Sequence, residues 1–233
     1  MTAVRPRDAA SLILLDYKGK KPYVLMGKRH PGHAFMPSKF VFPGGRLEAL
    51  DRRILVSGAL DLRVESKLCE KVTKSTSVKA RALALTALRE TYEETGIVIG
   101  ERGLGPYQAP AGTPWEIYEK KEIWPSLDGL DFVARAITPP AYPKRFDTRF
   151  FLCDSKMIAH QEPGFAGPDA EFVELVWVSI DEAKKLDIPS ITGMILTSLS
   201  EQLAQGLAPH RPIPFYRTKY GIYTREFLSG KLS

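Results

Sequence analysis

Residues 78–97, VKARALALTALRETYEETGI, place the strongest constraint on what this chain can fold into. At the roughly 100° per residue of an α-helix, Leu85, Leu88 and Tyr92 fall on one side, so that side can be buried. Gly96 can adopt the left-handed conformation with which helices commonly end. The stretch therefore predicts a long helix that stops at this glycine.

Three carboxylates, Glu90, Glu93 and Glu94, gather on nearly the opposite side of the predicted helix. Like charges this close raise one another's pKa values, which is unfavourable unless cations lie among them. Ligand sets made only of oxygen suit Mg²⁺ or Mn²⁺, which complete their shells with water and substrate phosphates. The pattern predicts a divalent-metal site, and the alternative is a solvated acidic helix face.

Residues 89–97 are similar to the second half of the Nudix box, whose pattern is R-E-apolar-x-E-E-x-G-apolar. Six of the seven specified positions match, and Thr91 is the exception because the pattern has an apolar residue there. Upstream, Phe42-Pro43-Gly44-Gly45 resembles the strand end and turn that open the same box. Together the two halves identify a resemblance to the Nudix hydrolases.

The two halves of the box lie unusually far apart. Five residues separate Gly45 from Asp51, which stands where the pattern has Glu, and residues 52–88 place 37 residues where the pattern has seven. Either Asp51 or Glu48 can take the role of the missing Glu and pair with Arg89. A split box of this kind resembles the branch of the family that includes the peroxisomal coenzyme A diphosphatases and many bacterial relatives.

The resemblance implies a single Nudix domain over residues 1–233, an α/β/α sandwich with a mixed β-sheet between helices. Within it, Leu60, Val64, Leu68 and Val72 recur every four residues and predict a helical insertion at about 52–77. That stripe is expected to be local core, and the alternatives are a lid or a dimer contact. Apolar runs predict strands at 9–16, 23–27, 40–42, 130–137, 145–153 and 171–178, a second major helix at 191–207, and a hairpin at 212–228.

The resemblance also implies a reaction, the metal-dependent hydrolysis of a nucleoside diphosphate linked to a moiety X, with coenzyme A or a related nucleotide among the substrates. The expected ligands of Mg²⁺ or Mn²⁺ are Glu90, Glu93, Glu94 and the backbone carbonyl of Gly44. Glu93, Glu90 and Arg89 form the expected catalytic set, in which Arg89 holds the glycine turn against the helix, and the general base is not assigned. The competing hypothesis is a Nudix-like nucleotide-binding or sensing module, weakened in catalysis by the altered first half of the box.

Four residues are expected to bind the substrate: Arg29, Gly45, Arg46 and Glu171. Arg29 could make a bidentate contact to a phosphate, or could be a solvated arginine at a strand end. Glycine at position 45 lets the backbone pass close to a metal or phosphate. Because some Nudix enzymes place a base or an extra metal ligand before the corresponding strand, Glu171 and Asp169 are both candidates there.

Composition limits the kinds of binding partner that we expect for this chain. A net charge of +6 and a pI near 9.2 favour anionic partners, but no basic run is interleaved with aromatics, so we expect a small nucleotide substrate and not nucleic acid. The absence of an eighteen-residue apolar run and of a signal-like N-terminus predicts a cytoplasmic protein without a membrane partner. Two cysteines without metal or disulfide spacing predict free thiols. Residues 231–233, KLS, do not match the peroxisomal Ser-Lys-Leu signal, and the resemblance implies a homodimer.

Overall fold

The computed structural model describes residues 4–33 and 35–230. The KLS sequence at 231–233 lies outside the described residues. No helix in the described part is long and apolar enough to cross a membrane. Cys69 and Cys153 are free thiols, as predicted.

Strands account for much of the chain and form two sheets. They are β1 (Arg7–Lys18), β2 (Lys21–Arg29), β3 (Phe40–Val41), β4 (Gly44–Arg46), β5 (Ile97–Arg102), β6 (Ile123–Pro125), β7 (Asp131–Ile137), β8 (Phe146–Asp154), β9 (Ile158–Gln161), β10 (Phe172–Ser179), β11 (Ile213–Lys219) and β12 (Ile222–Leu228). The helices are α1 (Leu62–Cys69), α2 (Ser77–Thr95), α3 (Glu116–Lys120), α4 (Ile180–Ala183) and α5 (Ser190–Ala204), with short 3₁₀ helices η1 (Leu50–Arg52) and η2 (Ser155–Met157).

The larger sheet is mixed and runs in the order β10-β2-β1-β8-β7-β11-β12, with β3 paired to β2 and β4 paired to β1. β1 pairs parallel with β8, and β11 pairs parallel with β7, whereas the remaining neighbours are antiparallel. The smaller sheet has the order β6-β5-β9. The predicted α/β fold with a mixed sheet is therefore confirmed.

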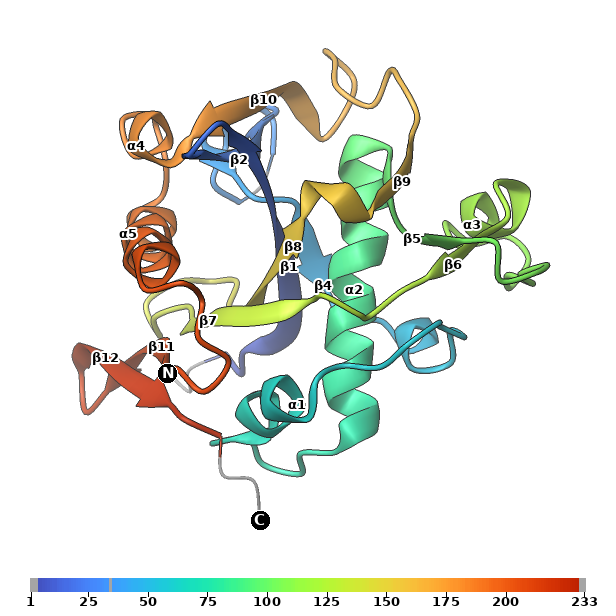
Figure 1. Ribbon diagram of the computed structural model, residues 1–233. Coiled ribbons are helices and arrows are strands. Elements are labelled where there is room, and N and C mark those ends of the chain that lie inside the picture. Colours follow the sequence, from blue (N-terminus) through green and yellow to red (C-terminus); the bar gives the residue numbers. More distant parts are fainter. Residues whose placement is uncertain (1–3, 34, 231–233) are drawn as a thin grey trace.

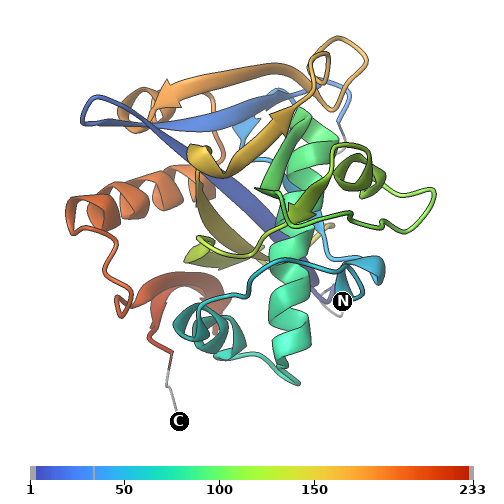
Figure 2. The same ribbon diagram turned by 45° about the vertical axis from the view of Figure 1, so that its right-hand side comes forward.

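Helices cover both faces of the larger sheet. Figure 1 shows α2 on one side of β1 and β8 and α5 on the other, and Figure 2 shows the same layers after a turn of 45°. One buried cluster joins the α2 side of the sheet to α1 and the smaller sheet, and a second lies between the sheet and α5. This three-layer arrangement brings the C-terminal half of α2 next to β4.

The long helix agrees with its sequence pattern. The side chain of Thr76 accepts a hydrogen bond from the Lys79 N–H at the first turn, and Gly96 ends α2 with a φ of 71°. Thr91, which departs from the Nudix pattern, is buried, and its hydroxyl donates to the Ala87 carbonyl at 2.7 Å. A polar residue is tolerated at this position because its hydrogen bond is satisfied within the helix.

The segment at 52–77 is helical over a shorter range than its pattern predicts. Leu60, Val64 and Leu68 are buried as expected, but α1 ends at Cys69. The backbone is extended at Glu70, with a ψ of 137°, and Lys71 then has a φ of 53°, so the chain has left the helix before Val72. The buried stripe places α1 in the core that it shares with α2, and the boundaries of a separate insertion remain a prediction.

The smaller sheet was not predicted from the sequence. β5 is a short run directly after α2, and its partners β6 and β9 are shorter still. Between them, Tyr107, Trp115 and Tyr118 are buried, so these aromatic residues form core. Strands this short carry a weak periodic signal, and only their long-range pairing defines them.

Candidate active site

A cavity of about 960 Å³ opens beside the C-terminal half of α2. Strands β2 and β4, the end of α2 and the residue before β10 form one side of it. Seven of the predicted site residues line this cavity: Arg29, Gly44, Gly45, Arg46, Glu90, Glu94 and Glu171. Arg89 and Glu93 do not line it. Arg89 contacts two residues that do, Glu90 and Arg46, and Glu93 is hydrogen-bonded to Arg89.

At both glycines of the turn, an added side chain would have to displace a neighbouring group. A Cβ atom added at Gly45 would lie 2.4 Å from the carboxylate atoms of Glu90, and one at Gly44 would lie 2.5 Å from the backbone oxygen of Ala10. The Gly44 N–H donates to Oε2 of Glu94 at 2.8 Å. The two glycines therefore let β4 fit between β1 and the carboxylates of α2.

Arg89 links the two halves of the sequence motif. Its Nε and Nη2 donate to Oδ1 and Oδ2 of Asp51 at 2.9 and 3.1 Å. Nη2 also donates to the Arg46 carbonyl at 2.9 Å, and Nη1 donates to Glu90 and Glu93 at 2.9 and 2.8 Å. Burial alone would lower the pKa of Arg89, but these hydrogen bonds and neighbouring negative charges raise it, so its positive charge is held in place.

Asp51 is the partner of Arg89, which the sequence left open between Asp51 and Glu48. Asp51 is fully buried, and Glu48 is exposed. Besides Arg89, Asp51 accepts hydrogen bonds from the Thr86 hydroxyl at 2.8 Å and from the Glu48 N–H at 2.9 Å. Asp51 thus ties η1 to α2 despite the long intervening segment.

Burial is the main influence on the three helix carboxylates. It raises the pKa of Glu90 to about 7, against the opposing charge of Arg89. It also raises the pKa of Glu93, and that of Glu94, 5% exposed, well above the usual range. Nearby carboxylates add to these effects, Glu93 on Glu90 and Glu171 on Glu94. The site therefore holds more negative charge than its own cations stabilise.

The donor chemistry of this site fits Mg²⁺ or Mn²⁺. Glu90 and Glu94 are carboxylates that lie in one cavity, in an environment that disfavours their charged forms, and hard cations bind such oxygens. In the described ranges, no three His, Cys, Asp or Glu side chains are already gathered around a common ion position. Arg89 and the Gly44 N–H hold carboxylate oxygens that an ion would take. The ligand set of Glu90, Glu93, Glu94 and the Gly44 carbonyl therefore stays a prediction.

Arg29 and Glu171 form a second charged group in the cavity. Nη1 of Arg29 lies 2.9 Å from Oε1 of Glu171, and the Arg29 side chain is 11% exposed. The alternative of a solvated arginine is therefore wrong. Nε2 of His33 lies 3.3 Å from the same oxygen, and His33 also lines the cavity. Asp169 is exposed and does not line the cavity.

The opposite side of the cavity comes from segments that the sequence did not connect to the site. They are the segment at 136–150, the first turns of α5, and the β11–β12 hairpin. Positions 146, 148 and 150 are alternate positions along β8 and share one face, and Phe146 and Phe150 line this side of the cavity. That alternation was visible in the sequence, but which face of the sheet carries the cavity was not.

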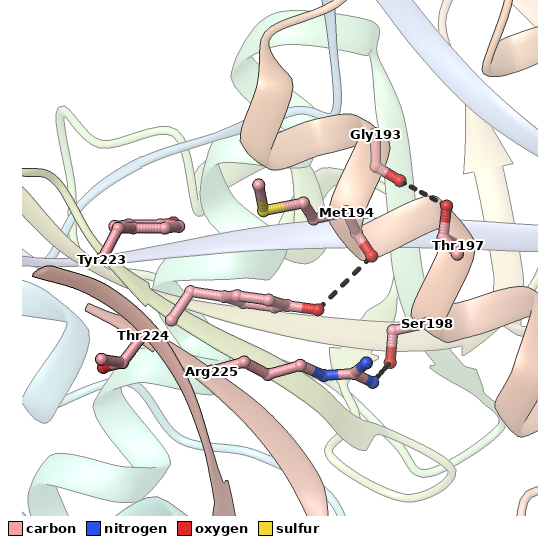
Figure 3. A pocket seen from close by; sticks show the side chains of 8 residues that line it. Gly193, Met194, Thr197, Ser198, Tyr223, Thr224 and Arg225 are labelled. Atoms are coloured by element: carbon pink, nitrogen blue, oxygen red, sulfur yellow. Dashed lines mark hydrogen bonds between the residues drawn. The ribbon is translucent and has the colours of Figure 1, made fainter. Parts of the chain in front are cut away.

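A second hollow of about 530 Å³ lies between α5 and the C-terminal hairpin (Figure 3). Among the described residues that line it, none is acidic, a histidine or a cysteine. Arg225 donates to the Ser198 hydroxyl at 3.4 Å, and the Thr197 hydroxyl donates to the Gly193 carbonyl at 3.0 Å. Met194 and Tyr223 line both hollows, so they form a shared wall.

Comparisons with known proteins agree with this geometry. No protein-family model matches the chain. A curated Caenorhabditis elegans protein, "Putative nudix hydrolase 7", is 27% identical over 213 residues, which cover 84% of this chain and 61% of that protein. The chain thus spans about three-fifths of that relative's length. A crystal structure of a Nudix hydrolase from Alicyclobacillus acidocaldarius is 24% identical, covers 83% of this chain and 90% of its own, and has a TM-score of 0.61.

The likeness to the Alicyclobacillus structure shows that this chain has the Nudix fold. The sequence similarity to a protein named as a Nudix hydrolase agrees with this fold.

Proposed function

We propose that this protein is a metal-dependent hydrolase of nucleoside diphosphates linked to a further group X. The observation that carries the proposal is the packing of Glu90 and Glu94 in one cavity against the Gly44–Gly45 turn. The relative's name and the shared fold support the same reaction class. Water attacks one phosphorus of the diphosphate, and the products are a nucleoside monophosphate and phospho-X.

Each residue has a proposed role in this reaction. Glu90, Glu93 and Glu94, with a backbone oxygen of Gly44, would hold Mg²⁺ or Mn²⁺, which neutralises the diphosphate and acidifies water. Arg89 is a positioning residue, because it orients two of these carboxylates and the β4 backbone.

Arg29 lines the cavity and is paired with Glu171. We propose that Arg29 releases Glu171 and binds a phosphate of the substrate in its place. Gly45 and Arg46 are proposed to bind the substrate through the backbone of β4. Coenzyme A and its thioesters are the proposed substrates within this class, on the resemblance of the split box. A homodimer and a cytoplasmic location remain predictions.

A Nudix-like binding or sensing module is the second candidate. It is supported by the ion pairs of Arg89 with Glu90 and Glu93. In this structure the positive charge next to these two carboxylates comes from the protein itself. A binding module would bind the nucleotide without cleaving it.

The experiment is turnover of a panel with Mg²⁺ or Mn²⁺: coenzyme A, acyl-coenzyme A, ADP-ribose, NADH and diadenosine polyphosphates. We expect metal-dependent cleavage by the native chain and its loss in Glu94→Gln and in Glu93→Gln. Glu174→Gln is the matched control, because Glu174 is exposed and does not line the cavity. Tight nucleotide binding without cleavage would favour the binding module, and full activity in both site variants would reject the ligand assignment.

A further inference from the structure

The first turn of α5 faces the large cavity across from the carboxylates. Ser190, Ile191 and Thr192 all line that cavity. The residue before the helix is Pro189, whose side chain makes no capping hydrogen bond, and the first turn contains no acidic residue. The backbone N–H groups of these three lining residues have no acceptor in the described part of the chain. A helix of this length leaves a partial positive charge there.

Thr192 adds a side-chain hydroxyl without a protein partner. The residue is 5% exposed and lines the cavity, and its hydroxyl makes no hydrogen bond to any described residue. Other helical threonines donate to the carbonyl four residues earlier: Thr86, Thr91, Thr95 and Thr197. Thr192 lies in the first turn, so the residue four positions before it is not helical. The hydroxyl is not among the fully enclosed polar atoms of the described residues, so it is accessible from the cavity and free for a ligand.

Charge divides the cavity into two ends. The acidic lining residues are Glu48, Glu90, Glu94 and Glu171, all at the end formed by β4, α2 and the residue before β10. On the opposite side, the described lining residues include one charged side chain, Lys144. Asp187, the acidic residue closest in sequence to the α5 turn, is paired with Lys39 and does not line the cavity.

Aromatic side chains line the cavity between its acidic end and its α5 end. Phe42, Phe146 and Phe150 line the cavity between the glycine turn and the α5 side. A ligand that reaches from the carboxylates to α5 therefore crosses aromatic surface and then meets unpaired donors. Unpaired N–H groups at a helix start suit a phosphate.

We propose that the first turn of α5, with Thr192 and Lys144, binds a second phosphate of the substrate, separate from the diphosphate that is cleaved. This inference rests on the proposed function, because it places the diphosphate at the carboxylates. The preferred substrates are then nucleoside diphosphates that carry an additional phosphate monoester.

Two substrate pairs differ only in this additional phosphate: coenzyme A with 3′-dephospho-coenzyme A, and NADPH with NADH. We expect the native chain to prefer the phosphorylated member of at least one pair by about ten-fold or more in kcat/KM, the size of one hydrogen bond to a charged group. Equal kcat/KM values within both pairs would overturn the inference and leave the proposed hydrolase standing.

Variants locate the phosphate site. Thr192→Val keeps the shape of the side chain and removes its hydroxyl, and we expect it to reduce the preference within the pair roughly ten-fold. The matched control is Thr197→Val on the same helix, whose hydroxyl bonds to Gly193 beside the second hollow (Figure 3); it should keep the native ratio. Lys144→Met, on an exposed part of the chain, gives a second test should Thr192→Val not fold. An unchanged ratio in both site variants would overturn the assignment to α5.

A binding experiment separates this inference from catalysis. Calorimetry in EDTA compares adenosine 3′,5′-bisphosphate and adenosine 2′,5′-bisphosphate with AMP, and inorganic phosphate serves as the free-ion probe. Tighter binding of either bisphosphate, lost in Thr192→Val, supports the site even where no substrate is cleaved. Binding of inorganic phosphate that Thr192→Val abolishes, with no preference for a bisphosphate, would show a free-anion site and overturn the substrate assignment.

Discussion

Each nitrogen of the Arg89 guanidinium group donates a hydrogen bond, and Asp51 accepts two of them. Both residues are buried, at 4% and 0% exposure of their side chains. A buried charge that loses its partner is costly, because the remaining charge can neither be solvated nor easily neutralised. The pair therefore has a larger role in stability than the exposed ion pairs of the surface.

Asp51→Asn should lower the free energy of unfolding by about 3 to 5 kcal/mol, because it leaves the Arg89 charge buried without its main counter-ion. Urea unfolding measures this change. Glu48→Gln serves as the control, since Glu48 is exposed and its substitution should stay within about 0.5 kcal/mol. Equal losses in the two variants would contradict Asp51 as the structural partner.

Glu90 makes the stability of the metal-free protein depend on pH. Its pKa is raised by burial from 4.5 to about 7, so the folded state favours the neutral acid. This contribution is fully present below pH 4.5 and is lost as the pH rises through about 7. We expect thermal unfolding in EDTA to show a loss on the order of 2 to 3 kcal/mol between these pH values.

Two comparisons test this linkage. Glu90→Gln should remove that part of the pH dependence, because the amide does not titrate. Added Mg²⁺ should restore stability at high pH, since an ion compensates the buried charge. A metal-free stability curve that has the same slope in the native chain and in Glu90→Gln would rule out this role for Glu90.

At the scale of elements, β4 and α2 depend on two glycines for different reasons. A Cβ at Gly44 would meet backbone atoms of Ala10 and Ser11 at 2.5 and 2.7 Å, whereas a Cβ at Gly45 would meet the mobile end of Glu90. Backbone cannot yield without moving a strand, and a carboxylate can rotate. A side chain at Gly44 would therefore disturb the packing of the sheet, whereas a side chain at Gly45 would disturb the carboxylate of the candidate active site.

Gly44→Ala should cost about 1 to 3 kcal/mol of stability, because β4 must move away from β1. Gly45→Ala should keep most of the stability but lower kcat/KM at least about ten-fold, because Glu90 is displaced. Chemical unfolding and steady-state kinetics on both variants give the comparison. The reverse pattern, with Gly45→Ala the less stable and Gly44→Ala the less active, would reject this division.

The sequence predicts elements best where one signal repeats. Residues 78–97 combine helical spacing with a terminal glycine, and α2 follows that pattern closely. The pairing of Arg89 was undecided because Glu48 and Asp51 lie in the same loop, and only the burial of Asp51 in η1 selects it. The α5 side of the cavity could not be predicted, since only the tertiary fold brings Thr192 of α5 and Phe146 of β8 to the same cavity.

At the scale of the whole molecule, α1 is joined to the C-terminal part of the chain. The Lys67 amine donates to the Pro209 carbonyl at 2.9 Å, and the Lys71 amine donates to Glu226 at 2.7 Å. Glu70 accepts from the backbone N–H groups of Ser229 and Gly230 at 2.8 and 2.9 Å. These contacts join segments far apart in sequence, so the region that splits the Nudix motif packs as part of the main body.

Leu68→Ala tests whether this region unfolds with the rest. Leu68 is 3% exposed in the core that joins α1, α2 and β12, so we expect a loss of about 2 to 5 kcal/mol. Hydrogen exchange should become faster in β12 as well as in α1, because the two share that core. Leu62→Ala, on the same helix but 73% exposed, should leave both segments protected. Faster exchange confined to α1 would instead mean that the insertion opens alone, and its packing would then favour the lid hypothesis over a structural part of the domain.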